Sequence, residues 1–206
     1  FNDYFVQEGL AFRFTPFNYK TWGDAEGDNG YAIDTEKFYE NVMNRYKYGG
    51  LDTPGLYLDE TTMRICYSHR RLFAQLAKEL VKQGDNARAQ KVLAYAEQAI
   101  PAYNVPQVYE SGSYEIATAY ASIGESGKAI TLLNDLIAES RDYIDWAFSL
   151  GDSRIAMVQR DCLYKFWQWN QCNELLKDMD KERYKQSNQQ FEEKYMRLAQ
   201  LMNYQN

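Results

Sequence analysis

Residue types that commonly carry out catalysis are sparse in this chain, and the closest pairing joins a cysteine to the only histidine. Cys66 and His69 are three residues apart, so a helix would place both side chains on one face. A thiol beside an imidazole is the arrangement of a cysteine nucleophile and its base. Helices also produce such neighbours by chance, and the sequence indicates no third group to orient the imidazole. We expect no catalytic residue in this chain.

Two acidic patterns resemble metal-binding motifs but lack their defining features. Acidic residues alternate from Asp24 to Asp28, as at the start of a calcium loop, but Asn29 stands where that loop requires glycine. Asp178 and Asp180 form the D-x-D pattern with which some glycosyltransferases hold a metal–nucleotide, but the stretch around them is charged and lacks a strand or glycine-rich loop. One histidine also excludes a multi-histidine metal site. We therefore interpret both patterns as solvated turns and expect no metal and no cofactor.

The charge and hydrophobicity of the sequence disfavour several classes of binding partner. The net charge of −6 and the pI near 5.0 disfavour nucleic acid and an anionic membrane surface, because both require a basic face. No apolar run reaches the length of about 20 residues that spans a bilayer. The chain begins at Phe1 rather than Met, so we expect a processed form or an excised piece, with any targeting or membrane segment outside it. Three cysteines provide no disulfide framework.

The elements that would position any site are helices, because a two-helix unit occurs twice. Residues 76–101 and 116–140 share small residues, a glycine turn and a leucine at matching positions 40 residues apart. The matching positions are Ala77, Gly84, Ala89 and Leu93 in the first copy, and Ala117, Gly124, Ala129 and Leu133 in the second. Small residues at these spacings let two helices cross closely, while the glycine makes the turn between them. We expect close contact between Ala77 and Ala89, and between Ala117 and Ala129.

These copies resemble tetratricopeptide repeats, which stack helical hairpins and expose a concave groove. The predicted fold is therefore mainly α, with tetratricopeptide-like stacked hairpins and a small extended or β N-terminal lead-in. The resemblance places the first helix of each unit on the groove. The groove candidates are Arg71, Lys78 and Lys82 from the first copy and Tyr114 and Thr118 from the second. A basic strip beside a tyrosine suits a carboxylate or an acidic peptide.

Residues 1–60 have a different pattern from the repeats. Apolar residues alternate from Leu10 onward, which predicts a strand, and Asp34 is a suitable N-cap for one helix. Tyr57 and Leu58 suggest a brief strand that pairs with the N-terminal segment. We therefore predict a lead-in at 1–60, with one helix and short strands, and a tetratricopeptide-like domain at 61–206.

A second resemblance covers roughly residues 8–155. The segment EGLAFRFTPF is followed by NRYKYGGL, then by the region from YLDETTMRICYSHRR to AQKVL, and then by VPQVYESGSYEIATAYASIGESGKA. This order resembles the C-terminal region of a bacterial family of multi-spanning membrane proteins similar to protein O-mannosyltransferases, known mainly as a domain of unknown function. The resemblance implies a tail on the extracytoplasmic, periplasmic side of the inner membrane, tethered through an upstream segment. It carries no catalytic residue onto this chain.

The sequence thus favours a non-catalytic soluble tail of a membrane-embedded glycosyltransferase-like protein, acting in protein or peptide binding or in acceptor positioning. The alternative is a glycan-binding helical-repeat module of the bacterial envelope, because the chain holds 18 Tyr, 10 Phe and 4 Trp. That alternative predicts at least two coplanar exposed rings among a set of six. The six are Trp22, Tyr103, Tyr109, Tyr114, Trp167 and Trp169. A purely structural spacer, with no ligand, is the third possibility.

Overall fold

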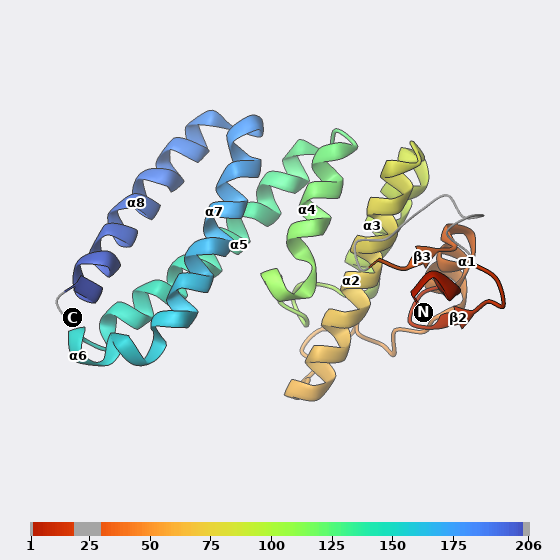
Figure 1. The fold of residues 1–206 in the computed structure, drawn as a ribbon, viewed down its shortest axis with the longest axis horizontal. Helices are drawn as coiled ribbons and strands as arrows, with labels where there is room; N and C mark the ends of the chain where they lie inside the picture. Colours follow the sequence, from red (N-terminus) through yellow and green to blue (C-terminus); the bar gives the residue numbers. More distant parts are fainter. Residues whose placement is uncertain (1, 19–29, 204–206) are drawn as a thin grey trace. The chain divides into compact units, whose positions relative to one another are not determined.

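The computed structural model describes residues 2–18 and 30–203, and most of these residues are helical (Figure 1). They form two compact units. Unit 1 contains the described residues up to Pro106 together with Glu110–Gly124, and unit 2 contains Gln107–Tyr109 and the described residues from Glu125 on. The fold is mainly α, with tetratricopeptide-like helical hairpins and a small N-terminal sheet, as predicted. The acidic pattern at 24–28 lies outside the described residues.

A three-stranded sheet opens unit 1, with the strand order β2-β1-β3. Strand β1 (Phe5–Gln7) pairs antiparallel with β2 (Phe12–Phe14) and parallel with β3 (Ala32–Ile33). The strand predicted from alternation at Leu10 is thus confirmed as β2. The strand predicted at Tyr57 is wrong: this residue lies in a loop and is 89% exposed, so it contributes no pairing. The third strand comes instead from β3, just before α1.

The single helix predicted in the lead-in is α1 (Thr35–Glu40), and it continues as a π-helical turn, Asn41–Arg45. Asp34 caps it as predicted, since its side chain accepts a hydrogen bond from the backbone N–H of Lys37. Helix α1 packs on α2, and Gln7 of β1 exchanges side-chain hydrogen bonds with Gln75 of α2. The predicted boundary near residue 60 therefore falls inside unit 1.

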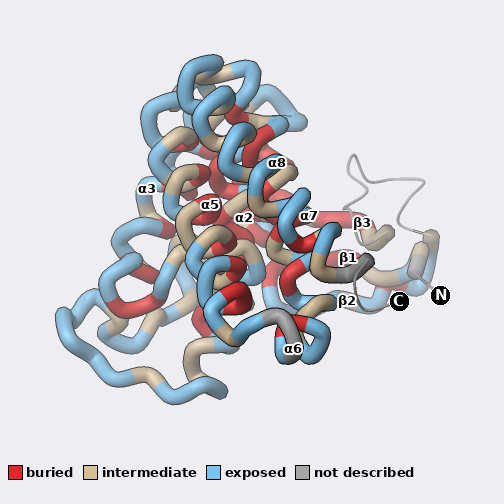
Figure 2. Tube along the Cα trace, turned by 90° about the vertical axis from the view of Figure 1, so that its left-hand side faces the viewer, coloured by how far each residue is buried: buried red, intermediate tan, exposed pale blue. Residues whose placement is uncertain are grey.

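Helices α2 (Glu60–Lys82) and α3 (Asn86–Ala99) form the first predicted hairpin. Asp59 and Asp85 cap their N-termini by accepting backbone N–H groups, and Gly84 makes the turn in the left-handed conformation. Ala77 and Ala89 are both fully buried where α2 and α3 pack together. In Figure 2 the buried positions follow the facing sides of the helices, and the exposed positions follow their outer sides.

Helix α4 (Ser113–Ser122) packs on α2 and α3, and the linker before it is held by a buried arginine. Arg70 of α2 is 1% exposed and donates to the backbone oxygens of Ile100, Val105 and Pro106 at 3.1, 2.6 and 2.7 Å, and to Ser111 Oγ at 3.1 Å. No carboxylate pairs with it among the residues that the structure describes. Burial lowers the pKa of Arg70 to about 10, so it stays charged at neutral pH.

Unit 2 is built from helices around α7. Its elements are α5 (Ser126–Ser149), the short α6 (Asp152–Ile155), a 3₁₀ turn at Ala156–Val158, α7 (Gln159–Met179) and α8 (Lys181–Asn203). Helix α7 packs on α5 and on α8. Trp169 is fully buried in α7 and donates its Nε1–H to Ser187 of α8, which in turn bonds Asn173. Cys162 and Cys172 lie ten residues apart on α7 and are buried, as is Cys66 in unit 1, and all three are thiols rather than disulfides.

The second predicted hairpin is divided between the two units. Helix α4, with Ala117, belongs to unit 1, whereas α5, with Ala129, packs on α7 in unit 2. The predicted contact between these two alanines therefore stays a prediction. Helix α5 also runs past the end of the repeat at residue 140, in one continuous helix to Ser149.

Replacing Arg70 with Met should destabilise unit 1 strongly. Met matches the aliphatic stem but leaves the linker carbonyls without a donor, and each buried acceptor that loses its partner costs about 1–3 kcal/mol. We expect a loss of about 3 kcal/mol or more in the free energy of unfolding, measured by urea denaturation. Arg64→Met is the matched control because its side chain is 75% exposed, and it should cost less than about 1 kcal/mol. Equal losses in both variants would contradict the role given to Arg70.

Candidate functional site

Four of the five predicted groove residues line a single hollow in unit 1. Lys78 and Lys82 of α2 face Tyr114 and Thr118 of α4 across a space of about 430 Å³. The remaining lining residues are Val81, Glu115, Ala119 and Ser122, which lie on the same two helices. The groove predicted from the repeat is therefore a concave surface between α2 and α4.

The fifth predicted residue, Arg71, lines a neighbouring hollow of about 500 Å³. Lys78 and Glu115 line both hollows, so the two lie side by side. Leu10 and Phe12 of the N-terminal lead-in form part of its wall, and both side chains are substantially exposed. Each hollow therefore combines cations with apolar side chains, and the apolar residues of the lead-in lie in the same hollow as Arg71 and Lys78.

The charge of the groove is mainly positive. Arg71, Lys78 and Lys82 contribute three cations, against one lining carboxylate, the exposed Glu115. Lys82 Nζ is tied to the buried Glu79 Oε1 at 2.8 Å. Arg71 is already oriented by hydrogen bonds to the Glu110 carbonyl and to Ser68 Oγ. Arg71 and Lys78 in particular suit a ligand with carboxylate groups, since Lys82 is already paired with Glu79.

Gly112 allows α4 to approach α2 closely enough to form the groove. It is the residue before α4, with φ +83°, and a Cβ at this position would lie 2.9 Å from Arg71 Cγ and 3.1 Å from Arg71 Cα. Ala74 Cβ is next, at 3.5 Å. Any side chain at position 112 would therefore push the start of α4 away from the helix that carries the cations.

Sequence reasoning missed the contribution of the lead-in to the groove. Val81, Glu115 and Ser122 follow named residues at helical spacing, so the repeat pattern contained a signal for them. Gln7, Leu10 and Phe12 join only because the sheet docks on α2 through the Gln7–Gln75 pair. That contact links residues 68 positions apart, and no local pattern predicts it.

The Cys66–His69 pair has neither the contacts nor the electrostatics of a nucleophile and its base. Burial raises the pKa of the Cys66 thiol and lowers the pKa of the His69 imidazole, so both groups favour their neutral forms. His69 instead meets the edges or faces of Tyr46 and Tyr48, at centroid distances of 6.2 and 5.5 Å. Its Nδ1 is buried and has no hydrogen-bond partner among the described residues.

The other sequence candidates are scattered. Asp180 caps α8, because its carboxylate accepts the backbone N–H of Arg183 and pairs with the guanidinium of the same residue. Among the aromatic residues, Trp169 is buried, whereas Trp167 is half exposed and stacks on Tyr164 with 15° between the rings. Tyr109 meets Trp167 edge-on. Trp22 lies outside the described residues.

The described residues contain no cluster of three or more side chains that would hold a metal ion, and none of their helices is long and apolar enough to cross a bilayer. Comparisons of the chain with protein-family models, with curated proteins and with solved structures found no match.

Replacing Gly112 with Ala should destabilise unit 1 more than the same change at Gly84. Both glycines have a left-handed backbone, with φ +83° and +78°, but a Cβ at Gly84 meets nothing within 4 Å. Gly84→Ala thus reports the backbone cost alone, about 1 kcal/mol. Gly112→Ala should cost about 1–2 kcal/mol more because Arg71 is in the way. Equal costs in urea denaturation would show that α4 does not need this close approach.

Acidification should destabilise the fold through His69. Its folded-state pKa lies below the unfolded value near 6.5, so the unfolded chain takes up a proton that the folded chain resists. The stability that comes from keeping His69 neutral is fully present above pH 6.5 and is lost as the pH falls below that value. His69 is the only histidine. The free energy of unfolding of the wild type should therefore fall between pH 7 and 5 relative to that of His69→Phe. Parallel pH profiles would contradict this assignment.

Proposed function

We propose that this chain is a non-catalytic binding module whose α2–α4 groove holds a carboxylate-bearing peptide segment of a partner protein. In the setting implied by the resemblance, it is the extracytoplasmic tail of a membrane-embedded glycosyltransferase-like protein, and the bound segment is a partner or an acceptor held near the membrane. One observation carries the proposal: Lys78, Lys82, Tyr114 and Thr118, chosen as groove residues from the repeat, line one hollow.

The groove offers both charge and apolar surface to such a segment. Arg71 and Lys78 supply cations for an acidic side chain or a C-terminal carboxylate, and the guanidinium is already oriented by the linker. Leu10 and Phe12 supply apolar surface in the same hollow. A short peptide with an acidic residue next to an apolar one would use both features.

The hydrogen bonds inside the groove support a binding role without chemistry. Thr118 donates its hydroxyl to the Tyr114 carbonyl, and Ser122 donates to Thr118 O, so both hydroxyls are already engaged as donors. No histidine or cysteine lines either hollow. Transfer of sugar from a lipid-linked donor by the isolated chain would contradict the non-catalytic part of the proposal.

Reversing the charge of Lys78 should weaken the binding of acidic peptides. The probe is a pool of fluorescein-labelled acidic peptides that carry one aromatic residue, compared with the same peptides in which Lys replaces each acidic residue. We expect the acidic pool to bind more tightly at low salt, and Lys78→Glu to weaken it about tenfold, as measured by fluorescence anisotropy. Lys91→Glu, on the exposed face of α3, should change the affinity less than twofold.

Two outcomes would overturn the groove assignment. One is equal binding of acidic and basic pools, which would show that the cations do not select the ligand. The other is an equal effect of Lys78→Glu and Lys91→Glu, which would show that affinity depends on the net charge of the chain rather than on the groove. The absence of any peptide binding would favour the spacer hypothesis.

A further inference from the structure

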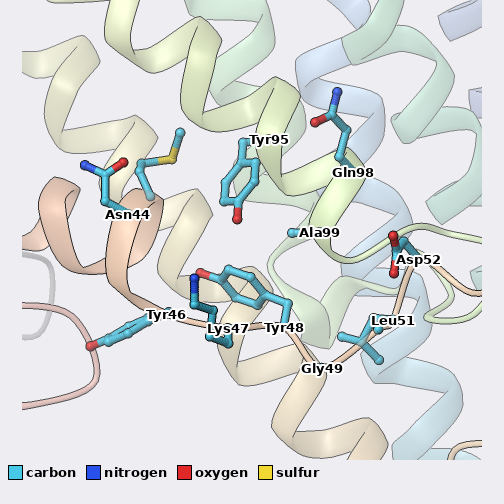
Figure 3. A pocket seen from close by; sticks show the side chains of 12 residues that line it. Asn44, Tyr46, Lys47, Tyr48, Gly49, Leu51, Asp52, Tyr95, Gln98 and Ala99 are labelled. Atoms are coloured by element: carbon cyan, nitrogen blue, oxygen red, sulfur yellow. The ribbon is translucent and has the colours of Figure 1, made fainter.

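A separate hollow in unit 1 lies between the π-helical turn, the loop that follows it and α3 (Figure 3). It has a volume of about 370 Å³, within the range of about 300–1,000 Å³ that is usual for small-molecule sites. It shares no lining residue with the groove between α2 and α4. A π-helical turn is a rare element that often occurs at functional sites, and here it forms one wall.

Tyrosine rings form the interior of this hollow. Tyr48 and Tyr95 meet edge to face, with ring centroids 6.0 Å apart, and in Figure 3 the Tyr95 side chain extends from α3 toward the Tyr48 ring. The Tyr48 ring packs against the rings of Phe73 and His69, and its hydroxyl donates to the Val42 carbonyl. The ring of Tyr48 is thus held by packing, whereas Tyr95 is half-buried at the edge of the hollow.

Four polar side chains that line this hollow are unpaired among the described residues. The Tyr95 hydroxyl, the Gln98 amide, the Lys47 ammonium and the Asp52 carboxylate make no hydrogen bond or ion pair in that part of the chain. Together they supply both donors and acceptors to one hollow. Their distribution suits a ligand that carries several hydroxyl groups.

Two glycines in the loop after the π-helical turn expose their backbone to the hollow. Gly49 and Gly50 have φ values of +62° and +77°, which glycine adopts without strain, and both line the hollow. Neither presents a side chain, so a ligand can lie directly against the main chain. A ring with several hydroxyls can therefore reach both the loop and α3.

The charged side chains that line the hollow favour some classes of ligand over others. The lining carries one cation, Lys47, and one anion, Asp52, so it has no excess charge to hold a phosphate or a second carboxylate. An apolar ligand would leave the amide and the hydroxyl unused. A neutral sugar matches both features, because its C–H faces pack on aromatic rings and its hydroxyls both donate and accept hydrogen bonds.

We propose that this hollow binds a neutral hexose residue of an oligosaccharide, with Tyr48 and Tyr95 packing on the sugar ring and Gln98 and Asp52 bonding its hydroxyls. The site is independent of the peptide groove. Loss of one would leave the other intact, and the two sites together would let the chain hold a glycan and a peptide at once.

The test is a glycan array that displays neutral and acidic oligosaccharides, both free and attached to serine peptides, followed by calorimetric titration of the tightest glycan. We expect binding to neutral hexose-containing glycans, and the two forms of display identify whether the source is a free glycan or a glycoprotein. Tyr95→Phe removes only the hydroxyl and should weaken binding about five- to tenfold, and Gln98→Ala should weaken it similarly.

Two controls separate this site from the rest of unit 1. Tyr57→Phe alters an 89% exposed tyrosine that does not line the hollow, and it should leave glycan affinity unchanged. Lys78→Glu should also leave it unchanged. The proposal fails if no neutral glycan binds, if acidic glycans bind in preference, or if the affinity survives the combined Tyr95→Phe and Gln98→Ala changes in a chain that remains folded by circular dichroism.

Discussion

The arrangement of unit 1 depends on a buried guanidinium that has no carboxylate partner among the residues that the structure describes. Arg70 donates its N–H groups to the backbone oxygens of Ile100, Val105 and Pro106, between α3 and α4, and its planar fork satisfies carbonyls that no helix or strand pairs. Burying an isolated charge is costly unless its hydrogen bonds are satisfied. The linker carbonyls and Ser111 provide that satisfaction, so the linker can lie against α2 only where Arg70 can reach it.

The position of α4 follows from this constraint. The linker places Gly112 beside Arg71. Because Gly112 has no side chain, α4 can begin in close contact with α2. Lys78 and Lys82 then face Tyr114 and Thr118 across a narrow space. Neighbouring arginines on α2 thus have different roles: Arg70 is buried and holds the linker, whereas Arg71 is exposed beside the groove. The basic groove is a consequence of how the linker is held, as much as of the residues that line it.

Local sequence patterns predicted the parts of this architecture that depend on local physics. The small residues at Ala77 and Ala89, the turn at Gly84 and the cap at Asp85 are recognisable because helix crossing, left-handed turns and capping each require particular residue types. The groove residues came from the resemblance to tetratricopeptide repeats, which places the first helix of each unit on the groove, and four of the five line one hollow.

Long-range contacts were not predictable in the same way. The parallel pairing of β1 with the two-residue strand β3 has no periodic signal, and the strand predicted at Tyr57 was chosen in its place. The sugar-sized hollow forms only when the loop that holds Tyr48 packs beside Tyr95 of α3. These contacts join residues dozens of positions apart, and tertiary packing decides them.

Hydrogen exchange of the Arg70→Lys variant tests the central claim most directly, because lysine keeps the positive charge but cannot form the planar fork. The account predicts that backbone amides of the linker at 101–111 and of α4 lose protection relative to the wild type, while those of α3 and of α7 keep theirs. Unchanged protection in α4, or an equal loss throughout the chain, would contradict the claim that Arg70 holds α4 on α2.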